Sequence, residues 1–211
     1  MDYFEQMAVL SQTLLSALAE GLKLAPNHFD DIIMPTAGDH TSYMRLNFYP
    51  PPLYEDEDEE SRLGISRHTD AGVLTVLYQD PIVSSLEVYS GTKQINDDGK
   101  WIPVHPPPAK SRGFTVNIGD MLQVMSNDIY KAPEHRVLAT PAGKSRYSAP
   151  FFYNPSYDGK IHPSTTNNVE QDRYQSFTWR HFRRQRFAGD FEDLGRKEIQ
   201  IEDFKVGPIA I

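Results

Sequence analysis

The sequence contains no cysteine, which excludes disulfide bonds, thiolate metal sites and cysteine nucleophiles and fits a reducing compartment. It also lacks any apolar run of about 18 residues that could cross a membrane. The first residues, MDYFEQMAVLSQ, show no features of a secretory signal. Acidic residues outnumber basic ones by 29 to 21, which disfavours nonspecific binding to nucleic acid or anionic lipid. We expect a cytoplasmic protein with no nucleic-acid or membrane partner.

Helical patterns lie at both ends of the chain, whose 211 residues fit a single domain, 1–211. A helix is predicted over residues 3–24 because apolar side chains recur at steps of three and four, at Met7, Leu10, Leu14, Leu18 and Leu22. A second helix is predicted over about 170–188. We interpret the basic residues of this helix as a solvated face rather than as an anion site. They are Arg180, Arg183, Arg184 and Arg186.

Between these helices, residues from about 42 to 155 form a series of short β-rich segments separated by turn sequences. The segment MLQVMSN is included among the predicted strands. Such a series, with no helices between the strands, indicates an antiparallel sandwich or barrel. The fold class expected is therefore mainly β with flanking helices. The acidic run Glu55–Glu60 is interpreted as solvated surface rather than as a cation site.

The stretch SRHTDAGVLTVLYQD places His68 and Asp70 one residue apart, directly before an apolar segment that reads as a buried strand. Residues two apart in a strand point to the same face, so both side chains can reach one metal ion. A hydrogen-bonded His–Asp pair is the competing interpretation. A third ligand would favour the metal.

His135 is the best candidate for that third ligand because it opens the predicted strand EHRVLAT after a turn. Two imidazoles and one carboxylate form a triad typical of non-haem Fe(II) with open positions, and a Zn²⁺ hydrolase is the chemical alternative. The remaining histidines lie in polar connections, beside prolines or among arginines: His28, His40, His105, His162 and His181.

Arg146 and Ser148 share one face of the next predicted strand, RYSAPFFYNP. A guanidinium group together with a hydroxyl group suits a bound carboxylate, although an exposed arginine beside a serine is the commoner arrangement.

Several motifs in the same order resemble the iron- and 2-oxoglutarate-dependent dioxygenases of the isopenicillin N synthase-like type. The similarity runs from about Met7 to Pro155. It comprises RLNFYPP, HTDAGVLTVLYQD, NIGDMLQVMSNDIYKAPEHRV and RYSAPFFYNPS. This resemblance implies a double-stranded β-helix (jelly-roll) core. It also implies an enzyme that couples the oxidation of a small organic molecule to decarboxylation of 2-oxoglutarate to succinate and CO₂.

The resemblance also implies specific roles for residues. Fe(II) would be bound by His68, Asp70 and His135, with no catalytic side chain beyond the metal centre. The distal carboxylate of 2-oxoglutarate would be bound by Arg146, Ser148 and Tyr49, and substrate contacts would include Asn47 and Phe152. O₂ is the co-substrate implied beside 2-oxoglutarate, and ascorbate is a candidate reductant. Gly119 and Asp120 are expected to form a tight turn rather than to take part in chemistry.

One departure from the family pattern is that its members usually carry a longer region before the opening helix. We therefore expect a shortened form that is a monomer, or a dimer if exposed sheet edges pair. Two further hypotheses stay open: an Fe(II)/O₂ oxidase that does not use 2-oxoglutarate, and a non-catalytic protein that retains the metal pocket.

Overall fold

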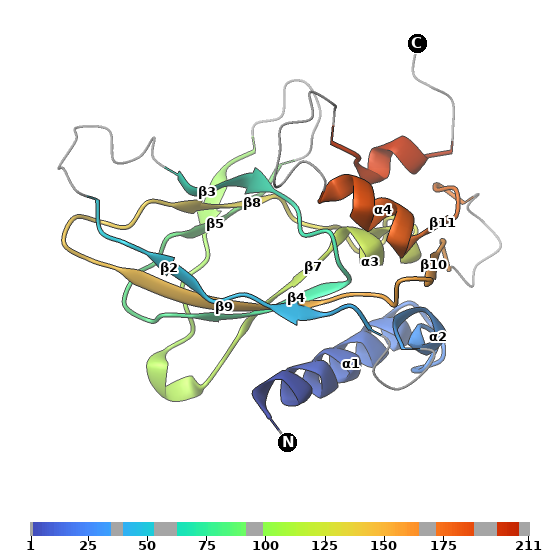
Figure 1. Cartoon of the computed structure of the whole chain (residues 1–211), viewed down its shortest axis with the longest axis horizontal. Helices are drawn as coiled ribbons and strands as arrows, with labels where there is room; N and C mark the ends of the chain where they lie inside the picture. Colours follow the sequence, from blue (N-terminus) through green and yellow to red (C-terminus); the bar gives the residue numbers. More distant parts are fainter. Residues whose placement is uncertain are drawn as a thin grey trace, which may run out of the picture.

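Two antiparallel β-sheets face each other in the computed structural model, and helices lie against the outside of one sheet and at one end (Figure 1). The structure describes residues 2–34, 40–52, 63–91, 99–164, 172–187 and 198–206. The acidic run Glu55–Glu60 lies outside these residues. No helix in the described ranges has the length and hydrophobicity needed to cross a membrane.

The chain passes repeatedly from one sheet to the other, as in a jelly roll. The major sheet has the order β1-β9-β4-β7, and β2 also pairs with β9. Its strands are β1 (Tyr43–Met44), β2 (Asn47–Tyr49), β4 (Leu74–Gln79), β7 (Thr115–Ile118) and β9 (Arg146–Tyr153). The minor sheet has the order β3-β8-β5-β6 and contains β3 (Leu63–His68), β5 (Leu86–Tyr89), β6 (Trp101–Pro103) and β8 (His135–Leu138). All pairings are antiparallel, which confirms the expected fold class.

Helix α1 (Tyr3–Gly21) covers part of the outer face of the major sheet (Figure 1). The Asp2 side chain caps its N-terminus by accepting a hydrogen bond from the Glu5 amide at 3.0 Å. The most buried face carries Met7, Ser11, Leu15 and Ala19. Leu10, Leu14 and Leu18 are only partly buried, so this face is rotated from the predicted stripe. The small side chains of Ser11 and Ala19 allow close packing against the sheet.

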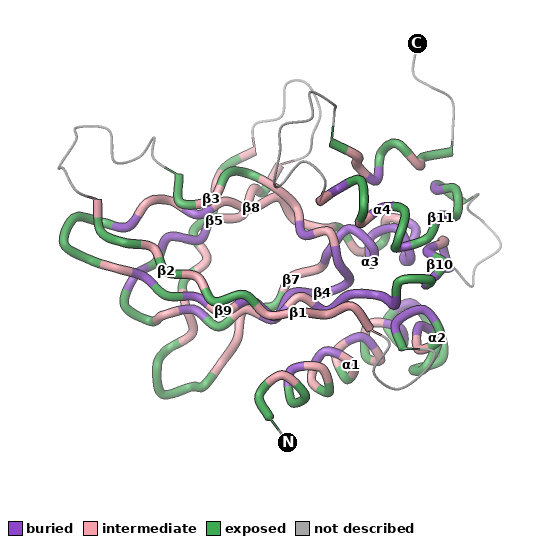
Figure 2. The backbone as a smooth tube through the Cα atoms, viewed as in Figure 1, coloured by how far each residue is buried: buried purple, intermediate pink, exposed green. Residues whose placement is uncertain are grey.

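The remaining elements are short and lie mainly around one end of the sheets. They are α2 (Asp30–Ile33), η2 (Ala109–Ser111), α3 (Asp120–Met125), β10 (Lys160–Ile161), β11 (Phe177–Thr178), α4 (Trp179–Arg186) and η3 (Ile201–Phe204). The buried backbone in Figure 2 includes the inner strands of the major sheet and α3.

Two sequence predictions of secondary structure were wrong. The segment MLQVMSN is not a strand, because its first five residues belong to α3. All six residues of that helix are buried, and a helix of six residues is too short for its sequence to reveal the helical period. The predicted helix 170–188 is also shorter than expected, because it begins only at Trp179, after β11. The Thr178 side chain marks this start by accepting a hydrogen bond from the His181 amide.

The basic residues of α4 form internal contacts. Arg180 forms an ion pair with Asp158 at 3.0 Å, and Arg186 forms one with Glu198 at 3.2 Å. The Arg186 residue is buried, which contradicts the solvated face expected for this position. Arg186 therefore connects α4 to the segment that precedes η3.

The turn between β7 and α3 holds the loop that follows β3 in place through backbone hydrogen bonds. The amides of Gly119, Asp120 and Met121 donate hydrogen bonds to the carbonyls of Val73, Asp70 and Gly72, at 2.9, 2.7 and 2.9 Å respectively. A Cβ atom on Gly119 would overlap the carbonyl oxygen of Gly72 and lie 2.7 Å from its carbonyl carbon. Glycine is therefore required here because two backbone segments approach each other closely.

We expect Gly119→Ala to lower the free energy of unfolding by about 2 kcal/mol or more, because the added methyl group must displace buried backbone. Urea denaturation monitored by circular dichroism measures this effect. Gly143→Ala is the control, since nothing lies within 4 Å of a Cβ there and only the positive φ of 71° opposes alanine. Equal unfolding midpoints for Gly119→Ala and the unmodified chain would contradict this account of the turn.

Candidate metal centre

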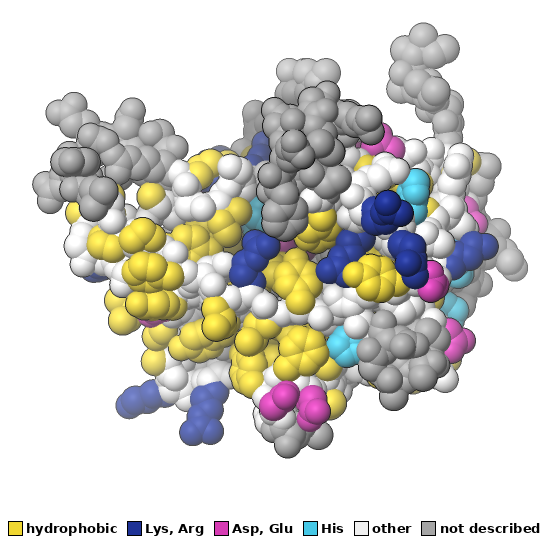
Figure 3. All heavy atoms as spheres, viewed as in Figure 1, with side chains coloured by type: hydrophobic (Ala, Val, Ile, Leu, Met, Phe, Trp, Pro, Cys, Tyr) yellow, Lys and Arg dark blue, Asp and Glu magenta, His cyan; other side chains and the backbone are white. Residues whose placement is uncertain are grey.

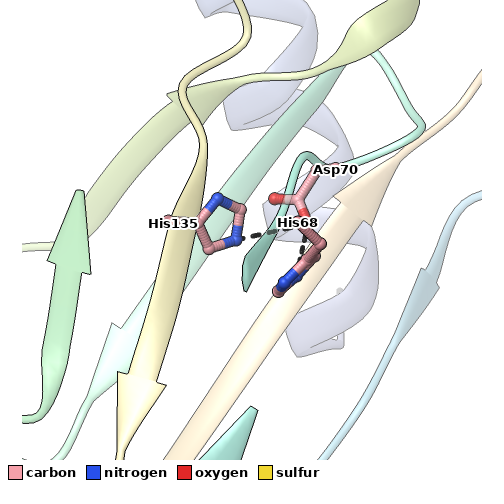
Figure 4. Close-up of side chains that lie close together, drawn as sticks. All are labelled: His68, Asp70 and His135. Atoms are coloured by element: carbon pink, nitrogen blue, oxygen red, sulfur yellow. Dashed lines mark ion pairs between the residues drawn. The ribbon is translucent and has the colours of Figure 1, made fainter. Parts of the chain in front are cut away.

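Three potential metal ligands meet at one end of the space between the two sheets. His68 is the last residue of β3, His135 is the first residue of β8, and the two are paired in register. Asp70 lies in the connection between β3 and β4. Figure 4 shows both imidazole rings and the Asp70 carboxylate directed toward a common region. The strand ends at His68, so loop geometry rather than strand alternation brings Asp70 to the site.

The distances between these side chains fit separate ligands of one ion. His68 Nε2 and His135 Nε2 lie 3.8 and 3.7 Å from Asp70 Oδ1, and one potential ligand atom from each residue lies within 4.8 Å of the others. Both nitrogen–oxygen distances exceed hydrogen-bonding range, which disfavours the interpretation as a hydrogen-bonded pair. Two donors that are each about 2.1 Å from a shared ion lie at most about 4.2 Å apart. An ion can thus be accommodated with small side-chain movements.

Hydrogen bonds to backbone carbonyls set the tautomers of both histidines. His68 Nδ1 lies 2.7 Å from the Ser66 carbonyl oxygen, and His135 Nδ1 lies 3.1 Å from that of Pro133. A carbonyl oxygen can only accept, so each Nδ1 carries the proton and each Nε2 offers a lone pair to the ion. Burial lowers the pKa of His68, and the neighbouring His135 lowers it further. Both effects favour the neutral, ligating form.

The second oxygen of Asp70 is already engaged. Asp70 Oδ2 accepts hydrogen bonds from Thr75 Oγ1 at 2.6 Å and from Asn117 Nδ2 at 2.8 Å. These donors, on β4 and β7, leave Oδ1 facing the two histidines. The carboxylate is therefore oriented to give one oxygen to an ion, which leaves more coordination positions open for other ligands.

A cavity of about 300 Å³ adjoins this triad and lies between the sheets. All predicted site residues line it: His68, Asp70, His135, Arg146, Ser148, Tyr49, Asn47 and Phe152. The other five histidines are described by the structure and do not line it. Most of the remaining wall is formed by aliphatic side chains. A ligand in this cavity would contact an apolar wall and a small number of polar groups, as in most small-molecule sites.

Arg146 is nearly fully buried at the opposite end of β9 from the triad. Its Nη2 donates a hydrogen bond to Gln79 Oε1 at 2.9 Å, but Nε and Nη1 have no hydrogen-bond partner among the described residues. Burial lowers the pKa of Arg146, yet a guanidinium group remains charged at neutral pH. A buried cation with free donors favours an anionic ligand in the cavity.

Neighbouring residues shape this anion site. Tyr49 pairs in register with Arg146, and its ring centroid lies 5.0 Å from Arg146 Cζ. Ser148 pairs with Asn47, whose Nδ2 donates a hydrogen bond to Ser148 Oγ at 3.2 Å. The Ser148 hydroxyl thus lies on the same strand as the guanidinium group, and the Tyr49 phenol lies on the strand paired with it, so that all three groups line one end of the cavity.

Sequence reasoning missed three polar residues of this region. Thr75 and Asn117 orient Asp70, and Gln79 accepts a hydrogen bond from Arg146. A signal was present for Thr75 and Gln79, since both interrupt or end an otherwise apolar buried strand. Polar side chains in such positions need hydrogen-bond partners.

Comparisons with known proteins agree with this geometry. The profile of the 2OG-Fe(II) oxygenase superfamily matches residues 40–155. Gibberellin 2-beta-dioxygenase 4 of Arabidopsis thaliana is 33% identical over 202 residues, covering 90% of this chain and 59% of the relative. DMR6-LIKE OXYGENASE 2 of the same plant is 38% identical over 182 residues, covering 84% of this chain and 47% of the relative.

Solved structures show the same fold. The crystal structure of JOX2 in complex with 2OG, Fe and JA superimposes with a TM-score of 0.70 at 33% identity, covering 86% of this chain and 49% of that one. The dioxygenase for auxin oxidation of rice gives a TM-score of 0.72 at 26% identity, covering 96% and 61%. The chain spans about half the length of the curated relatives that it matches. On the matched profile and these relatives, the chain belongs to the 2OG-Fe(II) oxygenase superfamily.

Proposed function

We propose that this chain forms the catalytic domain, residues 1–211, of an Fe(II)- and 2-oxoglutarate-dependent oxygenase that oxidises a small organic molecule. The observation that carries this proposal is the meeting of two sites in one cavity. A triad of two imidazoles and one carboxylate lies at one end, and a buried guanidinium group with free donors lies at the other. Family membership and the ligands named in the JOX2 structure support the same assignment.

The residues present fit both groups. His68, Asp70 and His135 offer the donor set that suits non-haem Fe(II) and would hold it through Nε2, Oδ1 and Nε2. Arg146, Ser148 and Tyr49 would hold one carboxylate of 2-oxoglutarate, whose 2-oxo acid end would lie toward the ion. When bound, the iron would supply the activation of O₂ that the oxidation of the substrate and the decarboxylation of 2-oxoglutarate to succinate and CO₂ require.

The role of the protein is to position these partners and to limit access of water. Thr75 and Asn117 hold Asp70 Oδ2 and keep the carboxylate from turning. The aliphatic walls of the cavity, which include Leu77 from β4 and Val137 from β8, exclude water from the reacting groups. Phe152 pairs in register with Thr75, so its ring lies in the part of the cavity near the metal ligands.

Location and assembly belong to the same proposal. We propose a cytoplasmic protein, on the basis of its cysteine-free sequence, with no nucleic-acid partner. Figure 3 shows hydrophobic side chains gathered on the face over β2 and β9, and the exposed ones include Leu46, Phe48 and Tyr147. Strand β7 is also an edge of the major sheet. These features support a monomer that can associate into a dimer.

The test of the proposed function is release of succinate from 2-oxoglutarate by the iron-loaded chain in the presence of O₂. We expect succinate from the unmodified chain and none from His135→Ala, which removes a ligand of the ion. Absence of succinate together with absence of 2-oxoglutarate binding would contradict the proposal. Substrate oxidation that proceeds equally without 2-oxoglutarate would instead identify an Fe(II)/O₂ oxidase, and intact metal binding without any oxidation would identify a binding protein.

We expect Thr75→Val to weaken metal binding by about tenfold or more, because Asp70 Oδ2 loses a hydrogen bond and the carboxylate can turn. Anaerobic titration with Mn²⁺ measures the affinity without turnover. Thr140→Val is the matched control, since this buried threonine donates its hydroxyl hydrogen to the Pro50 carbonyl instead. The control should lose stability but bind the metal normally. Unchanged Mn²⁺ affinity in Thr75→Val would show that this hydrogen bond does not position the ligand.

We expect Arg146→Gln to raise the KM for 2-oxoglutarate by about a hundredfold, because the distal carboxylate loses its charged hydrogen-bond donor. Mn²⁺ affinity should be unchanged, since Arg146 does not contact the triad. Arg180→Gln, which removes an arginine paired with Asp158 on the surface, is the control. A normal KM in Arg146→Gln would place the 2-oxoglutarate site elsewhere.

A further inference from the structure

The segment that leads to the candidate ligand His135 has no regular secondary structure. It comprises residues 126–134, between α3 and β8, and we call it the ligand loop. Asn127 and Asp128 have positive φ angles of 52° and 70°, so the chain turns sharply as it leaves α3. The loop therefore depends for its position on hydrogen bonds outside any strand ladder.

One side chain of α3 holds this loop close to His135. Gln123 is 8% exposed, and its Oε1 accepts a hydrogen bond from the Ala132 amide at 2.8 Å. Within the described ranges, this is the only hydrogen bond that joins the main chain of residues 131–133 to an element other than β8. The carbonyl oxygen of Pro133, the next residue, lies 3.1 Å from His135 Nδ1. Two adjacent loop residues thus connect the Gln123 carboxamide to the imidazole ring.

The carboxamide of Gln123 is held in one orientation. On its other side, Nε2 donates a hydrogen bond to Asp128 Oδ1 at 2.8 Å. Burial by itself would raise the pKa of Asp128, but hydrogen bonds from Tyr174 and Gln123 lower it, so the carboxylate is ionised at neutral pH. An ionised carboxylate only accepts hydrogen bonds, and a backbone amide only donates. Gln123 therefore cannot exchange its oxygen and nitrogen atoms without losing both partners.

The C-terminal part of the chain fixes the carboxylate that orients Gln123. The Tyr174 hydroxyl donates a hydrogen bond to Asp128 Oδ1 at 2.6 Å, and both side chains are nearly fully buried. Burial and this carboxylate raise the pKa of Tyr174, so the phenol keeps its proton and remains a donor. The Arg173 amide donates to Asn127 Oδ1 at 2.8 Å, which joins the same segment to the start of the ligand loop. In Figure 1, α3 lies beside the C-terminal strand β10.

We propose that Gln123, Asp128 and Tyr174 are positioning residues for the metal site. They hold the backbone next to His135 and so set the direction in which its Nε2 points. None of the three side chains lines the cavity, so they act through His135. This inference rests on the proposed function, in which His135 is a ligand of the ion. Tyr174 lies beyond residues 40–155, which match the family profile, so the metal site depends on a segment outside that match.

Anaerobic titration with Mn²⁺, well below the unfolding temperature, separates positioning from stability. We expect Gln123→Met to weaken Mn²⁺ binding by about tenfold, as is typical when a residue that orients a metal ligand is lost. Gln12→Met is the matched control, because the Gln12 carboxamide also joins a tyrosine to an aspartate, Tyr153 and Asp30, but does so on α1. Both variants should unfold more easily than the unmodified chain, and the control should bind Mn²⁺ normally.

An exchange of donor and acceptor tests the orientation of the carboxamide. Gln123→Glu brings a second carboxylate against Asp128, so it should also weaken Mn²⁺ binding. Addition of Asp128→Asn supplies a donor opposite the new acceptor and should restore most of the affinity, since asparagine tolerates a positive φ. Tyr174→Phe removes one hydroxyl donor and should cause a smaller loss. Hydrogen exchange of residues 126–135, followed by mass spectrometry, should be faster in each variant that binds Mn²⁺ more weakly.

The outcomes that would overturn the inference are distinct from failure of the proposed function. Equal Mn²⁺ affinities in the unmodified chain, Gln123→Met and Tyr174→Phe would overturn it. An equal loss of affinity in Gln12→Met would also do so, because the loss would then follow from stability alone, as would a double variant that binds no better than Gln123→Glu. If Gln123→Met does not fold, Tyr174→Phe and the double variant decide by the same criteria. Failure of the unmodified chain to bind Mn²⁺ would instead contradict the proposed function.

Discussion

The antiparallel pairing of β3 with β8 is the constraint on which the candidate site depends. It sets His68 opposite His135, although the two residues are far apart in the sequence. The turn at Gly119–Met121 then fixes the loop that carries Asp70 through three backbone hydrogen bonds. Main-chain contacts in both sheets thus position the three candidate metal ligands, His68, Asp70 and His135. The site forms only when the jelly roll has closed.

Each of the three candidate metal ligands has one polar side-chain atom that faces the site, because its other polar side-chain atom is held by hydrogen bonds. The Nδ1 atoms of His68 and His135 are bound to carbonyls, and Asp70 Oδ2 is held by Thr75 and Asn117. Because buried polar groups without partners are costly, these bonds stabilise the fold and also orient the ligands. Arg146 differs from this pattern, since its Nε and Nη1 have no hydrogen-bond partner among the described residues, and the partner that we propose for them is an external anion.

The sequence predicted the fold class and eight of the residues that line the cavity. The H-x-D pair could be recognised locally, and His135 was selected from its place at the start of a predicted strand. That the two segments meet was implied only by the resemblance to a family, because strand pairing over long sequence distances is not visible in a pattern. Helix α3 was missed since its six residues are too few to show a helical period. Asn117 was missed because its role depends on which residue lies opposite it, and that information exists only in the folded chain.

The most direct test of this account is an anomalous-difference map from crystals of the chain soaked in Mn²⁺. We predict one strong peak per chain, within bonding distance of His68 Nε2, Asp70 Oδ1 and His135 Nε2, with the side facing the cavity free of protein ligands. A map with no peak among these three atoms, or with a peak bound by other residues, would contradict the account.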